Sequence, residues 1–249
     1  MNKREIFEHY SSILDELIDN SLFFSTYFQS PYYIADDIFG YDDEVMRNGV
    51  SYHTGATRGC LVDEDEDYVV KFDIREDDYG SACEREVEIY RDAVESDLAQ
   101  YLCEAQYIGT YTHKINFYDY YNIELHMNWC DYEPEYFEKE FAEHEDEFGE
   151  LQEIVISLPL YAYRRADTFD CGPADAYSKA LAEQCESPLK ERNIAVATAF
   201  IRDYGFEEYE RFSEFAEAQG INDIHIANIG SIDSTMRIID YAGYHDGGY

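Results

Sequence analysis

Lysine is scarce in this sequence, and the scarcity limits what the protein can bind. Six lysines and twelve arginines stand against 55 aspartates and glutamates, which gives a net charge of −37 over 249 residues. A charge of this size repels nucleic acids and anionic membranes. We therefore expect no direct binding to DNA, to RNA or to a membrane surface.

Long apolar runs are missing as well. No run approaches the roughly 18 residues that a membrane-spanning helix needs. Residues 1–21 have an amphipathic helical pattern without the apolar core and cleavage site of a secretion signal. We therefore expect a cytoplasmic protein, located in the host cytoplasm if a virus encodes it.

The cysteines show no paired spacing. All six are scattered along the chain, and no two form a CxxC pair. Because no export signal is seen, we interpret them as reduced and mostly buried thiols, with a zinc site as the weaker alternative.

Apolar and aromatic residues, by contrast, are plentiful enough for a folded core. Hydrophobic residues make up 45% of the chain, so disorder is not expected despite the charge. The apolar segment 151–163 fits either a helix or a strand. Periodicity predicts helices over 4–20, 81–102, 131–150, 186–205 and 206–220, and strands over 59–62, 68–74, 105–113, 115–129, 223–230 and 236–242.

The predicted helix 81–102 has the clearest local signals. Ser81 is a predicted N-cap, and Glu84, three residues on, completes a capping box. Its predicted apolar stripe consists of Val87, Tyr90, Val94, Leu98 and Leu102.

The acidic charge has three explanations that the sequence leaves open. It can be a solubilising shell, including one adapted to high salt. It can imitate the DNA backbone and occupy the groove of a basic DNA-binding host protein, or it can dock another basic partner. Segment 131–150, with ten carboxylates and one lysine, is the most acidic part, and Phe137, Phe141 and Phe148 are its predicted buried side.

Three polar residues near the end of the chain lie beside short β-branched runs. Asn228 follows Asp223 by five residues, and Asp240 follows Asn228 by twelve. Oxygen ligands held at strand ends suit a hard cation such as Mg²⁺ and a phosphate.

Together with two earlier residues, this set resembles the protein-kinase-like superfamily, which includes aminoglycoside phosphotransferases and phage-encoded relatives. Lys71 in YVVKF is similar to the VAIK lysine, and Glu86, fifteen residues on in a predicted helix, is similar to the αC glutamate. Asp223 and Asn228 resemble the D-x-x-x-x-N catalytic loop, and Asp240 after MRII resembles the DFG metal ligand.

The resemblance covers about residues 48–243 and implies an α+β, bilobal protein-kinase-like fold. A helical extension over 1–47 would precede a β-rich N-lobe with one αC-type helix over 48–128. A reduced, mainly helical C-lobe would follow over 129–249.

The resemblance also implies that ATP and Mg²⁺ are the cofactors. Lys71 would hold the α- and β-phosphates and Glu86 would fix Lys71, while Asp223 would accept the proton of a substrate hydroxyl. Asn228 and Asp240 would bind Mg²⁺. Gly55 and Gly59 in TGATRG would let the backbone approach the phosphates, and Thr57 between them is a further predicted cofactor-binding residue.

Plainer alternatives exist for several of these roles. Lys71 can form an ordinary strand ion pair, and Glu84 and Glu88 compete with Glu86 for the αC role. For His225 we prefer a scaffolding hydrogen bond within its loop to proton transfer.

The sequence also departs from the family pattern. The turn has two glycines instead of three, DYAG replaces DFG, and Asn222 stands where many kinases have arginine. Only nine residues follow Asp240, so we expect no activation segment and disfavour a protein-substrate kinase. The predicted function is a minimal kinase-like phosphotransferase, in which catalysis is retained or lost. The alternative is a non-enzymatic acidic DNA mimic that inhibits a host DNA-binding or defence protein.

Overall fold

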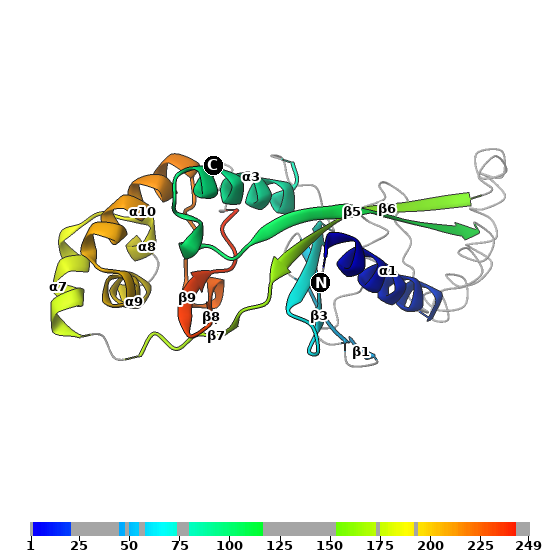
Figure 1. Ribbon diagram of the computed structural model, residues 1–249, viewed down its shortest axis with the longest axis horizontal. Coiled ribbons are helices and arrows are strands. Elements are labelled where there is room, and N and C mark those ends of the chain that lie inside the picture. Colours follow the sequence, from blue (N-terminus) through cyan, green and yellow to red (C-terminus); the bar gives the residue numbers. More distant parts are fainter. Residues whose placement is uncertain are drawn as a thin grey trace, which may run out of the picture. The chain divides into compact units, whose positions relative to one another are not determined.

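The computed structural model is an α+β protein that describes residues 2–20, 45–47, 50–54, 58–73, 80–116, 153–172, 175–191 and 194–242 (Figure 1). The chain forms two compact units, each of which takes two stretches of sequence. Unit 1 comprises Met1–Gly80 and Tyr107–Ala162, and unit 2 comprises Ser81–Gln106 and Tyr163–Tyr249. The continuous domains predicted over 1–47, 48–128 and 129–249 stay predictions.

A six-stranded sheet is the main feature of unit 1. Its strand order is β1-β2-β3-β4-β6-β5, and the pairs from β1 to β4 are antiparallel. The strands are β1 (Val45–Arg47), β2 (Val50–Thr54), β3 (Arg58–Asp63), β4 (Tyr68–Asp73), β5 (Ala105–Asn116) and β6 (Glu153–Arg164). The described part of the apolar segment 151–163, from Glu153 on, is therefore a strand, and β5 confirms the strand predicted over 105–113.

Helix α1 (Lys3–Asn20) confirms the helix predicted over 4–20. It begins at Asn2, whose side-chain oxygen accepts the backbone N–H of Glu5 at 3.1 Å, while the Asn2 N–H donates to the Glu5 carboxylate at 2.8 Å. Ile6, Tyr10 and Leu14, one helical turn apart, are fully buried. The Tyr10 hydroxyl also donates to the carbonyl of Tyr68 in β4, which ties the helix to the sheet.

The β3–β4 hairpin confirms the predicted strands 59–62 and 68–74 and the acidic turn between them. Its register pairs Cys60 with Lys71 and Gly59 with Phe72. In the turn, the Asp63 side chain accepts the backbone N–H of Asp65 at 3.0 Å. Alternation along the strands buries Phe72 and leaves its neighbour Lys71 half-buried.

Unit 2 combines helices with a small antiparallel sheet of strand order β7-β8-β9. The helical elements are α3 (Ala82–Glu95), η1 (Ala99–Tyr101), α7 (Ala176–Gln184), α8 (Pro188–Glu191), α9 (Ile194–Tyr204), α10 (Phe206–Gln219) and η2 (Ile226–Asn228). The strands are β7 (Asp167–Thr168), β8 (Ile229–Ile232) and β9 (Thr235–Ile238).

Aromatic rings form the core of unit 2 around Phe200 of α9. The Phe200 ring centroid lies 5.0 Å from that of Tyr101, 4.8 Å from Tyr204 and 5.3 Å from Phe212. These separations are typical of favourable tilted and offset aromatic pairs. The cluster joins η1, α9 and α10, so the helices pack through shared rings.

Three predictions about helices are wrong in detail. The helix predicted over 81–102 ends at Glu95, and Asp97 then has a left-handed φ of +56°. The buried face of α3 is not the predicted stripe, because Val94 is 56% exposed. Its buried residues are Cys83, Glu86, Ile89 and Ala93. The helix predicted over 186–205 is divided into α8 and α9.

Other predictions are confirmed or lie outside the described residues. The Ser81 hydroxyl accepts the backbone N–H of Glu84 at 2.9 Å, which confirms this N-cap. The predicted strand 223–230 begins only at Ile229, and β9 returns antiparallel as expected. Outside the described residues lie the predicted acidic helix 131–150 and most of the predicted strand 115–129.

Candidate functional site

The loop that carries Asp223 and Asn228 is closed by hydrogen bonds of its own. It starts after α10, which ends at Gly220 with a left-handed φ of +67°, as the sequence predicts. The Asn228 side-chain amide donates to the backbone carbonyl of Asp223 at 2.6 Å. His225 accepts the Ala227 N–H through Nδ1 at 3.2 Å, and its carbonyl accepts the Asn228 N–H at 2.9 Å. His225 therefore scaffolds this loop, and its ring nitrogen does so by accepting a backbone N–H.

The β8–β9 hairpin brings the chain back beside this loop. Its two-residue turn, Asp233 and Ser234, has φ values of +53° and +62°, which match the twist of a tight hairpin. At the open end of the hairpin, the Ile239 N–H donates to the Asn228 carbonyl at 2.9 Å. Asp240 therefore follows a residue that is bonded directly to Asn228.

Glu86 reaches the same segment from α3. Its side chain is fully buried, whereas Glu84 and Glu88 are exposed. One carboxylate oxygen, Oε1, accepts the N–H of Tyr241 at 2.8 Å and of Ala242 at 3.3 Å. These are the two residues directly after Asp240, so four of the predicted site residues are neighbours within unit 2.

Tyr241 is a neighbour that sequence reasoning missed. Its buried hydroxyl donates to the carbonyl of Cys103 at 2.8 Å. Burial, and then the charge of Glu86, raise the pKa of this tyrosine well above its usual value, so the phenol stays neutral. No local pattern connects Tyr241 with Cys103, because 138 residues separate them.

The other predicted site residues lie elsewhere or outside the described part. Lys71 is on β4 in unit 1, so its predicted pairing with Glu86 joins residues of different units and stays a prediction. Gly59 is a buried strand residue of β3, where it pairs with Thr54 and Phe72. Gly55 and Thr57 are not among the described residues.

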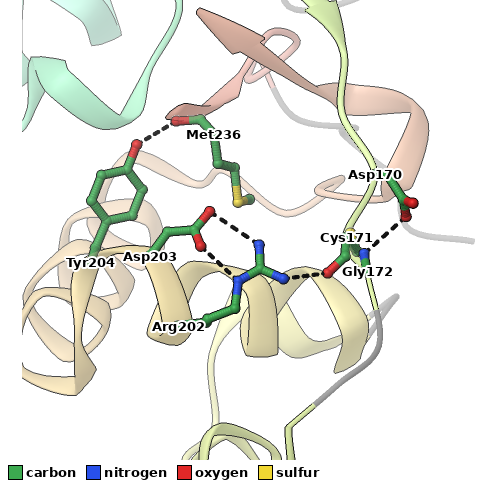
Figure 2. Close-up of polar contacts among 7 residues, drawn as sticks. All are labelled: Asp170, Cys171, Gly172, Arg202, Asp203, Tyr204 and Met236. Carbon is green, nitrogen blue, oxygen red and sulfur yellow. Dashed lines mark hydrogen bonds and ion pairs between the residues drawn. The ribbon is translucent and has the colours of Figure 1, made fainter. Parts of the chain in front are cut away.

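A network around Arg202 connects α9 with the segment after β7 and, through Tyr204, with β9 (Figure 2). The Arg202 guanidinium donates to the Cys171 carbonyl at 2.7 Å and binds the Asp203 carboxylate at 2.7 and 3.2 Å. The Tyr204 hydroxyl donates to the carbonyl of Met236 in β9. Burial raises the pKa of the Cys171 thiol, and the Arg202 charge opposes this shift. Helix α9 therefore holds β9, the strand that leads to Asp240.

The side-chain oxygens of Asn228 and Asp240 suit a hard cation better than a zinc ion. The Asn228 amide nitrogen is bonded to Asp223, so its oxygen lies on the opposite side of the amide group. Asn228 and Asp240 offer oxygen ligands, which Mg²⁺ prefers. Among the described residues, no group of three or more His, Cys, Asp or Glu side chains could hold a metal. A cation here would need further oxygen ligands, such as those of a phosphate.

Comparison with known proteins found no match to a family model, to a curated protein or to a solved structure. Within the part of the chain that the structure describes, no helix is both long and apolar enough to cross a membrane.

Proposed function

We propose that the protein is a phosphotransferase with a reduced, bilobal kinase-like fold that binds ATP and Mg²⁺. The observation that supports this is the closed Asp223–Asn228 loop, with Asp240 held beside it by the β8–β9 pairing. Asp, Asn and Asp in this order and proximity match the loop and metal-ligand segments of the family that the sequence resembles.

Three predicted site residues of unit 2 have defined tasks in this proposal. Asp223 is half-buried and would accept the proton of an acceptor hydroxyl. Asn228 presents its amide oxygen, and Asp240 its carboxylate, to a cation. Mg²⁺, when bound, would neutralise the phosphate charge of the nucleotide.

The charge of the whole protein makes this cation necessary. ATP carries several negative charges, and the chain has a net charge of −37. Bringing the two together without a cation would be opposed by Coulomb repulsion. We therefore infer that nucleotide binding depends strongly on Mg²⁺.

A thermal-shift titration tests the proposal. With ATP and Mg²⁺ at 100 times the dissociation constant, binding should add about 2.7 kcal/mol to the free energy of unfolding. The shift should vanish without Mg²⁺ and in Asp240→Asn. Asp233→Asn is the matched control, because Asp233 is an exposed acid in the β8–β9 turn where asparagine tolerates a positive φ. No shift at millimolar Mg-ATP, together with no phosphate transfer to any partner, would contradict the proposal.

A second variant separates catalysis from binding. Asp223→Asn keeps the backbone carbonyl that binds Asn228 and removes only the proton acceptor. If the enzyme is active, phosphate transfer should slow by roughly 10²–10⁴-fold while the Mg-ATP thermal shift remains. An unchanged rate would show that Asp223 is not the base.

The acidic surface supports a second candidate, an inhibitor that mimics DNA. Besides the net charge of −37, α10 exposes a series of glutamates: Glu207, Glu210, Glu214 and Glu217. A mimic should bind a purified basic DNA-binding protein, compete with duplex DNA, and lose affinity as salt rises. Binding that is absent or insensitive to salt would eliminate this candidate.

A further inference from the structure

Glu86 makes contacts that a partner of Lys71 would not need. Its carboxylate is fully buried within a protein that already has excess negative charge. A buried carboxylate is costly unless it is hydrogen-bonded. In unit 2, Oε1 accepts two backbone N–H groups, those of Tyr241 and Ala242. Bonds of this kind, with a charged acceptor, are stronger than those between neutral groups.

Helix α3, which carries Glu86, is bound to α10 near both of its ends. Near the start of α3, Arg85 donates to the Gln219 carbonyl at 3.0 Å. The Gln219 side chain donates to Asp92, in the last turn of α3, at 3.2 Å. At its C-terminus, Arg211 of α10 donates to the Ser96 carbonyl. Both arginines bind carbonyls at helix ends, which lack partners inside their helices. Since α10 leads directly into the Asp223 loop, α3 and this loop share one support.

The backbone around Asp240 is therefore held on both sides. Before it, the Ile239 N–H is bonded to the Asn228 carbonyl. After it, the N–H groups of Tyr241 and Ala242 are bonded to Glu86, and the Tyr241 hydroxyl is bonded to Cys103. The single residue between these contacts is the predicted metal ligand.

We propose that Glu86 is the positioning residue for Asp240: it fixes the backbone after Asp240 and so holds that carboxylate beside Asn228. The metal-binding part of this inference rests on the proposed function, whereas the anchoring does not. The role requires an acceptor oxygen at the position of Oε1. A charge pair with Lys71, by contrast, requires a negative charge.

Glutamine and alanine at residue 86 distinguish these two roles. Glu86→Gln keeps an acceptor oxygen and removes the charge, and Glu86→Ala removes both. Hydrogen exchange of the Tyr241 and Ala242 amides, measured without any ligand, should accelerate at least about tenfold in Glu86→Ala, and much less in Glu86→Gln. Glu88→Ala, at an exposed position of the same helix, is the control and should leave both amides protected.

Equal loss of protection in the glutamine and alanine variants would overturn the proposal, and so would full protection in Glu86→Ala. If Glu86→Ala does not fold, Glu86→Gln decides alone. Protected amides in that variant support the anchoring, and exposed amides refute it.

The Mg²⁺ dependence of nucleotide binding tests the consequence for Asp240. Glu86→Ala should raise the Mg²⁺ concentration needed for the half-maximal thermal shift, and adding it to Asp240→Asn should cause no further loss. If Asp240→Asn weakens binding but Glu86→Ala does not, Glu86 does not position Asp240. If Asp240→Asn has no effect either, the proposed function fails, and the exchange data still decide the anchoring.

Discussion

The two units hold their predicted site residues by different means. In unit 1, Lys71 is placed by strand register: β3 and β4 pair along their length, and buried neighbours such as Phe72 set the face of each residue. In unit 2, Asn228, Asp240 and Glu86 come from three segments, and specific hydrogen bonds bring them together.

This difference determines how robust each placement is. A register depends on many equivalent backbone bonds and on alternating burial, so one side chain can change without moving Lys71. The arrangement in unit 2 depends on a few contacts between distant segments and on the aromatic core that supports them. We therefore expect unit 2 to be the more sensitive to single substitutions.

The largest effect should come from the centre of the aromatic core of unit 2. Phe200→Ala removes a ring that contacts four aromatic neighbours and is 1% exposed, so we expect a loss of about 3–5 kcal/mol in the free energy of unfolding. Urea denaturation measures it. Phe206→Ala, at a half-buried position in the first turn of α10, is the control and should cost clearly less. Equal effects would show that the cluster is not the core of unit 2.

The corresponding substitution in unit 1 is Leu14→Ala in α1. Leu14 is fully buried, and a cavity of this kind costs about 2–5 kcal/mol. Ile13→Ala is the control and should cost less, because Ile13, the residue before Leu14, is only half-buried. If Leu14→Ala costs more than Phe200→Ala, the expected greater sensitivity of unit 2 is wrong.

Two glycines allow the most direct comparison of the units. A Cβ at Gly230 in β8 would lie 2.7 Å from the Cβ of Ala166 and 3.0 Å from the Asp167 carbonyl oxygen, which cannot move without the backbone. A Cβ at Gly109 in β5 would lie 2.8 Å from the ring of Phe7, a side chain that can rotate. Overpacking of this kind costs about 1–3 kcal/mol at either glycine. Gly109 also has a φ of +155°, which strains the backbone of any residue with a side chain, so we expect both variants to be destabilised, Gly230→Ala by the backbone clash and Gly109→Ala mainly by this strain.

The measurement is thermal or urea unfolding of both variants. Gly230→Ala should also weaken Mg-ATP binding, because Gly230 is two residues from Asn228, whereas Gly109→Ala should not. If Gly109→Ala weakens Mg-ATP binding as much as Gly230→Ala does, the effect at Gly230 is not specific to the Asn228 segment.

The same contrast explains what could be predicted from the sequence. Local signals were sufficient for α1, the β3–β4 hairpin, the cap at Ser81 and the end of α10 at Gly220, because each depends on residues a few positions apart. The motif order also selected Asp223, Asn228 and Asp240, and the structure shows that they are neighbours.

Long-range contacts are where sequence reasoning failed. Val94 and Val87 were predicted to face inward because they are apolar, yet the buried face of α3 includes the charged Glu86. Tyr241 and Ala242, 155 and 156 residues away, supply N–H donors that stabilise this buried carboxylate. Periodicity contains no information about such partners.

Alkaline pH offers a smaller effect that also compares the units. Burial raises the pKa of Tyr10 in unit 1, so above about pH 10 the unfolded state loses a proton that the folded state keeps. The free energy of unfolding should therefore fall as pH rises beyond this value. In unit 2, burial likewise raises the pKa of Tyr101, Tyr204, Tyr209 and Tyr241.

Tyr10→Phe isolates the contribution of unit 1. At neutral pH it removes the hydrogen bond to Tyr68 and should cost roughly 1 kcal/mol. Above pH 10 the variant should show a shallower loss of stability than the parent protein, because residue 10 no longer ionises. An identical pH profile in parent and variant would mean that the Tyr10 phenol ionises equally in both states.

The smallest expected effects come from the helix N-caps, one in each unit. Asn2 and Ser81 each accept a backbone N–H three residues on, and removing such a cap costs about 1 kcal/mol. Asn2→Ala should increase hydrogen exchange in the first turn of α1 only, because Lys71, the predicted site residue of unit 1, lies far along the chain from this turn. Ser81→Ala should loosen the first turns of α3, and because Glu86 lies there, it should also expose the Tyr241 and Ala242 amides. A cap that affects only its own helix turn in both units would show that α3 does not transmit its position to the Asp240 segment.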